Sequence, residues 1–185
     1  MREYIKRNIE AELEKVAKGF PVIMVTGPRQ VGKSTLLNNL SLTTNQEISN
    51  VSLDDLMTRK RAIEDPALFI SSLKTPVIID EFQYAPNILS YIKIAVDEAR
   101  LKSFKEEGVQ YNGLYYLTGS QPFSTMKNIS ESLAGRVGLL DLYGLSLREN
   151  YGLANEDIFL PDLEVLKKRK QINKMTLARN IWNNF

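Results

Sequence analysis

A phosphate-binding motif lies near the start of the chain, in the stretch MVTGPRQVGKST from Met24 to Thr35. In its spacing, G-x-x-x-x-G-K-S, the two glycines allow backbone conformations that other residues avoid, so that successive N–H groups can point at phosphate oxygens. A helix that opens at Lys33 adds the positive end of its dipole. The sequence therefore predicts a nucleotide-binding loop made of Gly27, Pro28, Arg29, Gln30, Val31, Gly32, Lys33, Ser34 and Thr35.

Two side chains of this loop have predicted chemical roles. Lys33 would reach the β- and γ-phosphates and assist catalysis, and the hydroxyl of Ser34 would ligate Mg²⁺. Arg29 and Gln30 would contact the nucleotide or the carboxylates of Asp80 and Glu81, or else face solvent, and the sequence leaves these interpretations open. The motif also has the context it requires, since the apolar run Val22–Val25 precedes it and helical residues follow it.

A pair of carboxylates ends another apolar stretch, VIIDE from Val77 to Glu81. A strand that ends in Asp80 places this carboxylate at the carboxyl edge of a parallel sheet, where such folds bind their ligands. There Asp80 would hold Mg²⁺, and Glu81 would polarise a water molecule toward the γ-phosphate. The simpler alternative is that both residues only end a strand and begin a turn. The loop upstream favours the catalytic interpretation.

These residues must be positioned by a sheet, and the hydrophobic pattern predicts one. Buried strands are expected at residues 22–25, 50–55, 76–80, 114–118 and 137–142. Helices are expected over 2–18, over 33 to about 40, and from residues 66, 88 and 147 onward, with Asp65, Asn87 and Ser146 as N-caps. Strands that alternate with helices indicate an α/β fold with a parallel sheet covered on both faces.

The composition excludes several kinds of chemistry. The 185 residues include no cysteine and no histidine, so disulfides, thiolate or imidazole metal sites and histidine bases are absent. No apolar run approaches the roughly 20 residues of a membrane span, and the charged start is unlike a signal peptide, so a cytoplasmic location is expected. The net charge of +2 does not by itself argue for nucleic-acid binding, and the basic run Lys167–Lys170 supports it only weakly.

The chain resembles the AAA-like P-loop ATPases of bacteria and archaea, which often carry a C-terminal domain of unknown function. The matching pieces occur in the family's order and cover about residues 4–149. They are YIKR at Tyr4, GPRQVGKST at Gly27, SLDD at Ser52, DP at Asp65, VIIDEFQYAP at Val77, LTGSQ at Leu117 and SLAGRV at Ser132.

This resemblance implies a three-layer fold of the RecA/AAA type, with a mostly parallel five-stranded sheet and an extra strand between the loop strand and the Asp80 strand. It also implies that Ser120 or Gln121 lies beside the γ-phosphate, although the same residues would otherwise suit an ordinary turn. Arg136 would assist catalysis in its own site or, through self-assembly, in a neighbour's site. The alternative for Arg136 is a salt bridge or exposure to solvent.

The leading functional hypothesis is Mg-dependent ATP hydrolysis that drives or times a conformational switch, with a client that the sequence does not identify. A small-molecule kinase is disfavoured because no arginine cluster forms a lid, and a GTPase because NKMT at Asn173 lacks the aspartate of the guanine motif. A nucleotide-binding regulatory module with little turnover and an ATP-coupled DNA-handling protein stay open. Residues 1–150 would form the ATPase domain, including an N-terminal amphipathic helix, and 151–185 a helical tail. This tail would either begin a second domain or belong to a naturally short member of the family.

Overall fold

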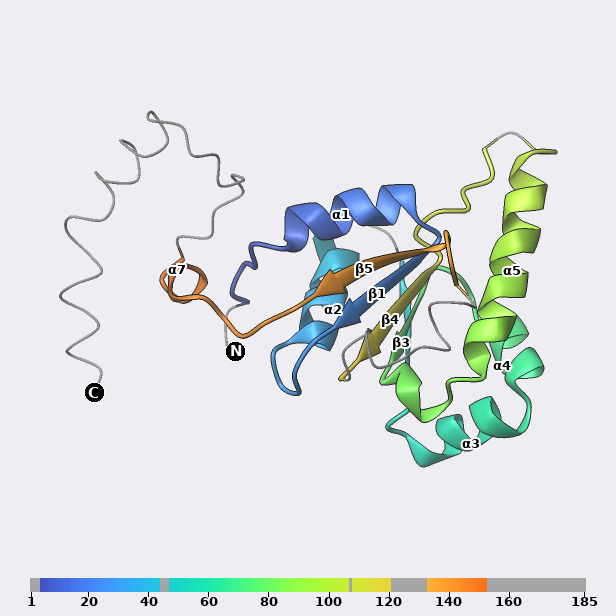
Figure 1. Ribbon diagram of the computed structural model, residues 1–185, viewed down its shortest axis with the longest axis horizontal. Helices are drawn as coiled ribbons and strands as arrows, with labels where there is room; N and C mark the ends of the chain where they lie inside the picture. The colour runs from blue at the N-terminus through green and yellow to red at the C-terminus, as the bar shows by residue number, and fades with distance from the viewer. Residues whose placement is uncertain (1–3, 44–46, 107, 121–132, 153–185) are drawn as a thin grey trace. The chain divides into compact units, whose positions relative to one another are not determined.

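The computed structural model describes residues 4–43, 47–106, 108–120 and 133–152. In this part of the chain five strands form one sheet in the order β2-β3-β4-β1-β5, and every neighbouring pair is parallel (Figure 1). The strands are β1 (Val22–Thr26), β2 (Ser49–Ser52), β3 (Val77–Asp80), β4 (Tyr115–Gly119) and β5 (Val137–Asp141). The α/β fold of the RecA/AAA type is therefore confirmed, including the strand that separates β1 from β3.

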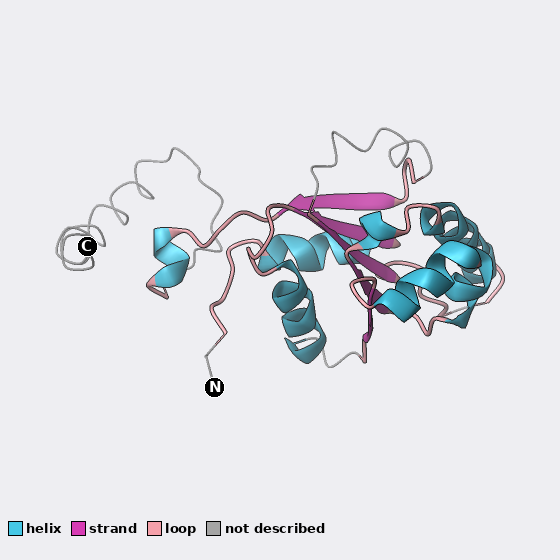
Figure 2. Ribbon diagram, turned by 90° about the horizontal axis from the view of Figure 1, so that it is seen from below, coloured by secondary structure: helices cyan, strands magenta, loops and turns pink. Residues whose placement is uncertain are grey.

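Helices cover both faces of the sheet (Figure 2). One face packs against α1 (Glu10–Gly19) and α2 (Lys33–Thr43). The other packs against α3 (Leu56–Glu64), α4 (Pro66–Ser72) and α5 (Ile88–Ser103). Two short helices, η1 (Phe82–Tyr84) and α7 (Leu147–Asn150), follow strands β3 and β5.

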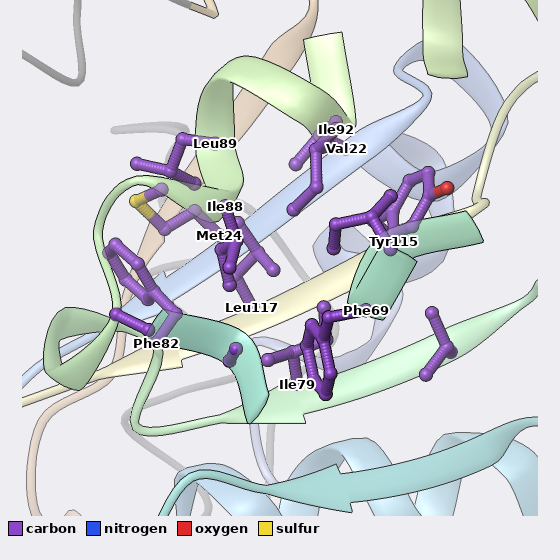
Figure 3. Packing of buried hydrophobic residues seen from close by; sticks show 14 of the residues in the cluster. Val22, Met24, Phe69, Ile79, Phe82, Ile88, Leu89, Ile92, Tyr115 and Leu117 are labelled. Carbon is purple, nitrogen blue, oxygen red and sulfur yellow. The ribbon is translucent and has the colours of Figure 1, made fainter. Parts of the chain in front are cut away.

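Strand β1 shows why the buried strands read as continuous apolar runs. Val22 and Met24 point into the core under α4 and α5 (Figure 3), whereas Ile23 and Val25 point into the core under α1 and α2. A parallel strand with helices on both faces needs apolar side chains at every position rather than at alternate ones. The same pattern makes β3 recognisable in the sequence.

Some element boundaries differ from the sequence-based expectation. The first helix begins at Glu10 rather than at residue 2, because the Glu10 carboxylate accepts hydrogen bonds from the backbone N–H of Arg7 (2.6 Å) and the hydroxyl of Tyr4 (2.7 Å). These bonds fold the preceding segment back instead of extending the helix. Helix α3 was not predicted, although Asp55 caps it by accepting from the Thr58 N–H at 2.8 Å.

The predicted helix starts at residues 66, 88 and 147 are confirmed. Asp65 caps α4, and Ser146 with Glu149 forms a complete capping box at α7. Asn87 precedes α5 but its side chain makes no capping hydrogen bond, so that part of the prediction was wrong.

The chain divides into two compact units, Met1–Ala154 and Asn155–Phe185, and all the described elements belong to the first. Within the described ranges no helix combines the length and the apolar character that crossing a membrane requires. The basic run, the predicted helical tail and Gln121 lie outside these ranges.

Candidate functional site

The loop between β1 and α2 lies at the carboxyl end of the sheet, where the labelled strands point in Figure 1. Its backbone has positive φ at Gly27 (142°), Gln30 (64°) and Gly32 (93°). A Cβ at Gly27 would lie 2.0 Å from the carbonyl oxygen of Leu142, so only glycine fits between the loop and the chain leaving β5. Gln30 is held in a conformation that non-glycine residues rarely adopt, a feature that clusters at binding sites.

Lys33 is buried at the start of α2, with only 5% of its surface exposed. Its ammonium group donates hydrogen bonds to the carbonyl oxygens of Gly27 (3.1 Å) and Pro28 (2.9 Å). The side chain therefore folds back on the loop, and its charge lies against two of the loop's carbonyl groups.

Asp80 joins the ends of three elements. Its Oδ1 accepts hydrogen bonds from the Ser34 hydroxyl at 2.8 Å and from the Thr118 hydroxyl. The Thr118 oxygen in turn accepts from the backbone N–H of Glu81 at 3.1 Å. The structure thus brings together Ser34 and Asp80, the two predicted metal ligands, and adds Thr118, which sequence analysis missed. The family resemblance pointed instead to Ser120 or Gln121, which follow Thr118 in the sequence.

Glu81 lies one residue beyond β3 with φ of 55°, in the left-handed region. Its carboxylate accepts a hydrogen bond from the side-chain amide of Gln83, and the same amide donates to the Ser120 hydroxyl at 3.2 Å. The buried Oε1 of Gln83 finds no hydrogen-bond partner among the described residues. The predicted base Glu81 and the predicted sensor residue Ser120 are therefore joined through the side chain of Gln83.

The oxygen atoms at this edge suit a magnesium ion. A carboxylate and a hydroxyl are hard oxygen ligands, and Mg²⁺ typically takes one or two such groups while substrate phosphates and water complete its shell. Among the described residues no group of three or more acidic, histidine or cysteine side chains could hold a metal alone. Ser34 and Asp80, which lie beside the phosphate-binding loop, therefore fit an ion that is shared with a bound phosphate.

Arg136 lies away from these groups. It forms a two-pronged ion pair with Asp97 of α5, with Nε–Oδ1 and Nη2–Oδ2 distances of 2.7 and 3.0 Å. This hydrogen-bonded guanidinium lowers the pKa of Asp97 below its ordinary value. Val137 pairs in register with Val22, so Arg136 lies at the amino end of the sheet, about one strand length (roughly 16 Å) from the loop. The structure thus does not bring Arg136 to the loop of its own chain, and it shows the salt bridge that was the alternative for this residue. A catalytic role for Arg136 stays a prediction that only a neighbour's site would fit.

A cavity of about 480 Å³ opens beside the loop. Three segments that are far apart in the sequence form its walls: the chain before α1, the loop with the first turn of α2, and the chain between β5 and α7. The lining residues are Tyr4, Ile5, Arg7, Gln30, Val31, Gly32, Thr35, Gly144 and Leu145. The sequence does not reveal this cavity, because no local pattern shows that these segments meet.

Comparison with known proteins identifies the fold and the family. The model of an AAA domain family matches residues 19–151. Uncharacterized proteins of Mycobacterium bovis and Mycobacterium tuberculosis are each 29% identical over 155 residues, which cover 84% of this chain and 32% of theirs. The chain thus spans about a third of the length of these curated relatives. The Walker-type ATPase PABY2304 of Pyrococcus abyssi aligns with a TM-score of 0.52 and 18% identity over 90% of this chain and 63% of its own, a likeness of fold.

Proposed function

Since the chain belongs to this AAA domain family, we propose that it binds Mg-ATP at the loop and hydrolyses it. The observation that carries this proposal is the hydrogen-bonded set around Asp80. Asp80 Oδ1 accepts hydrogen bonds from the hydroxyls of Ser34 and Thr118. The Thr118 oxygen in turn accepts from the backbone N–H of Glu81. Metal ligand and base are thereby held by the same few atoms, which is what in-line phosphoryl transfer to water requires.

The loop and α2 would bind the triphosphate. Backbone N–H groups of the loop, which Pro28 lacks, and the amino end of α2 would donate to the phosphate oxygens. Lys33 would exchange its two carbonyl partners in the loop for phosphate oxygens. Ser34 and Asp80 would hold Mg²⁺, which when bound neutralises charge on the phosphates.

Glu81 would act as the general base. Its carboxylate would take a proton from water while the water oxygen attacks the γ-phosphorus and the bond to the bridging oxygen of ADP breaks. Ser120 and Gln83 lie beside this carboxylate, so they would orient it and the water. The left-handed backbone at Glu81 supports this role, since strained conformations of this kind cluster at active sites.

The cavity beside the loop would take the adenine and ribose. Its volume of about 480 Å³ lies within the usual range of small-molecule sites. Tyr4, Ile5 and Leu145 give it apolar and aromatic walls. Adenine needs little more than such walls and backbone groups, because it is a flat and weakly polar ring.

We further propose that hydrolysis drives a conformational switch in a longer, self-assembling protein. The domain at residues 1–150 would be its ATPase part, and 151–185 would begin the part that acts on the client, in keeping with the greater length of the mycobacterial relatives. Arg136 would serve the site of a neighbouring subunit. A nucleotide-binding module with little turnover is the alternative that the same site supports.

The test is the hydrolysis of Mg-ATP by the purified chain and by two variants. Glu81→Gln should keep ATP binding but lose at least about 100-fold in kcat, because the proton acceptor is gone. Lys33→Ala should lose ATP binding itself. A wild-type chain that binds ATP but turns it over no faster than Glu81→Gln would reject hydrolysis and favour the binding module.

A further inference from the structure

A single buried arginine joins the three walls of the cavity beside the loop. Only 7% of the surface of Arg7 is exposed. Its guanidinium donates to the carbonyl oxygen of Val31 in the loop (2.9 Å), to that of Tyr143 after β5 (2.7 Å) and to the Glu149 carboxylate in α7 (3.1 Å). These three acceptors lie 24, 136 and 142 residues away in the sequence.

Glu149 completes the connection from the other side. Its Oε1 also accepts from the backbone N–H of Asn8 (2.8 Å), and its Oε2 from that of Ser146 (2.7 Å). Burial acts to raise the pKa of Glu149, but these backbone hydrogen bonds and the Arg7 side chain outweigh it, so the pKa lies below its ordinary value. A charged carboxylate therefore faces a charged guanidinium inside the protein.

The arrangement holds only if all its parts are present. A buried guanidinium needs its acceptors, and removing one partner leaves the others without compensation. The planar fork of arginine can reach three acceptors in different directions, which the single ammonium of lysine cannot do with the same geometry. The segment Tyr4–Glu10 and the segment Tyr143–Glu149 therefore lie against the loop through Arg7.

We propose that Arg7 is a positioning residue that builds the nucleoside end of the nucleotide site, holding these two segments against Val31 so that the cavity fits a base and base binding is tied to α7. This inference rests on the proposed function. It concerns one end of the site only: the phosphate end is built by the backbone of the loop, Lys33 and α2. Of the hydrogen bonds of the Arg7 guanidinium described above, only the one to the Val31 carbonyl reaches the loop.

The two ends can be separated by two ligands, Mg-ATP and magnesium tripolyphosphate, which share the phosphates and differ in the nucleoside. We expect the full wild-type chain to bind ATP more tightly than tripolyphosphate. Arg7→Met should lower the affinity for ATP by at least about tenfold and change the affinity for tripolyphosphate by less than about threefold. A general loss of stability would not produce this difference. Arg7→Lys should restore only part of the ATP affinity. Titration calorimetry measures all of these constants.

Two further variants make the result decisive. Glu149→Gln keeps the shape of the side chain but removes its charge, and it should lower the affinity for ATP selectively. It serves as the test if Arg7→Met does not fold. Arg100→Met removes an arginine from the exposed face of α5 and should change neither constant. A wild-type chain that binds neither ligand would reject the proposed function. If the wild-type chain binds both ligands, two results would overturn the role of Arg7 while leaving the proposed function standing. One is equal affinity of the wild type for the two ligands. The other is an equal loss of affinity for both ligands in Arg7→Met and Glu149→Gln.

Discussion

At the scale of single residues, the centre of the site is one oxygen atom. Asp80 Oδ1 accepts from hydroxyls on α2 and β4, and the β4 hydroxyl also holds the backbone of Glu81. A hydroxyl can donate once while accepting elsewhere, so Thr118 can serve the carboxylate and the N–H at the same time. Valine, which has a similar volume, can do neither.

Replacing this hydroxyl tests its importance directly. Thr118→Val keeps the volume but leaves the Glu81 N–H without its acceptor, which costs about 1–3 kcal/mol when such a group is buried. If that energy is lost from the positioned base, kcat for ATP falls about 10- to 100-fold while ATP affinity changes little. Steady-state kinetics measures both quantities. Thr118→Ser is the matched control, because it restores the hydroxyl, and equal rates for the valine and serine variants would contradict the assignment.

At the scale of elements, packing against the sheet decides where each helix lies. Gly138 of β5 is buried under α1: a Cβ there would lie 2.2 Å from Cγ1 of Val16 and 3.0 Å from the ring of Phe20. The absence of a side chain at this position lets α1 approach β5 closely. The segment that precedes α1 contains Arg7 and lines the cavity.

We therefore expect Gly138→Ala to push α1 off the sheet and to destabilise the protein by about 1–3 kcal/mol, as overpacking typically does. Unfolding by urea, followed by circular dichroism, measures the difference. Gly19→Ala is the control at the end of α1, where an added Cβ meets no described atom within 4 Å. If Gly138→Ala lowers the free energy of unfolding less than Gly19→Ala does, the contact between α1 and β5 relaxes freely.

The elements also show what the sequence could and could not predict. Strands β1 and β3 were predictable because burial on both faces leaves an uninterrupted apolar run. The loop was predictable because its chemistry lies in one short stretch. Helix α3 was missed because Leu56, Met57 and Ile63 are exposed, so its apolar residues do not mark a core-facing stripe. The start of α1 was misplaced because Ile5 continues the helical period, whereas the Glu10 carboxylate folds the segment before it back through Tyr4 and Arg7. The Arg7 side chain then reaches acceptors more than a hundred residues away, which no local pattern predicts.

At the scale of the whole molecule, the proposed self-assembly depends on where Arg136 lies. It lies at the amino end of the sheet, whereas the loop lies at the carboxyl end, so a head-to-tail contact between copies would place the arginine of one near the loop of the next. Its ion pair with Asp97 does not prevent this. The pair is partly exposed, with 28% and 39% of the side chains accessible, and pairs of this kind contribute only about 0–1 kcal/mol.

Mixing two inactive variants tests this arrangement. Lys33→Ala removes phosphate binding but keeps Arg136, and Arg136→Ala keeps the phosphate site but lacks the arginine. If Arg136 serves a neighbour, a mixture of the two regains part of the activity that each has lost, because an Arg136→Ala subunit can receive the arginine of a Lys33→Ala subunit. Turnover per chain in the wild type should likewise rise with protein concentration.

The variant Asp97→Asn separates assembly from a purely structural salt bridge. It breaks the ion pair while leaving Arg136 in place, so it should retain most of the activity if the arginine acts on a neighbouring site. If the ion pair only holds α5 against the start of β5, Asp97→Asn and Arg136→Ala should lose activity and stability equally. The mixture would then stay inactive at every concentration. Because the loop and Arg136 lie at opposite ends of the same sheet, that result would also mean that each chain completes its phosphate site without an arginine from this position.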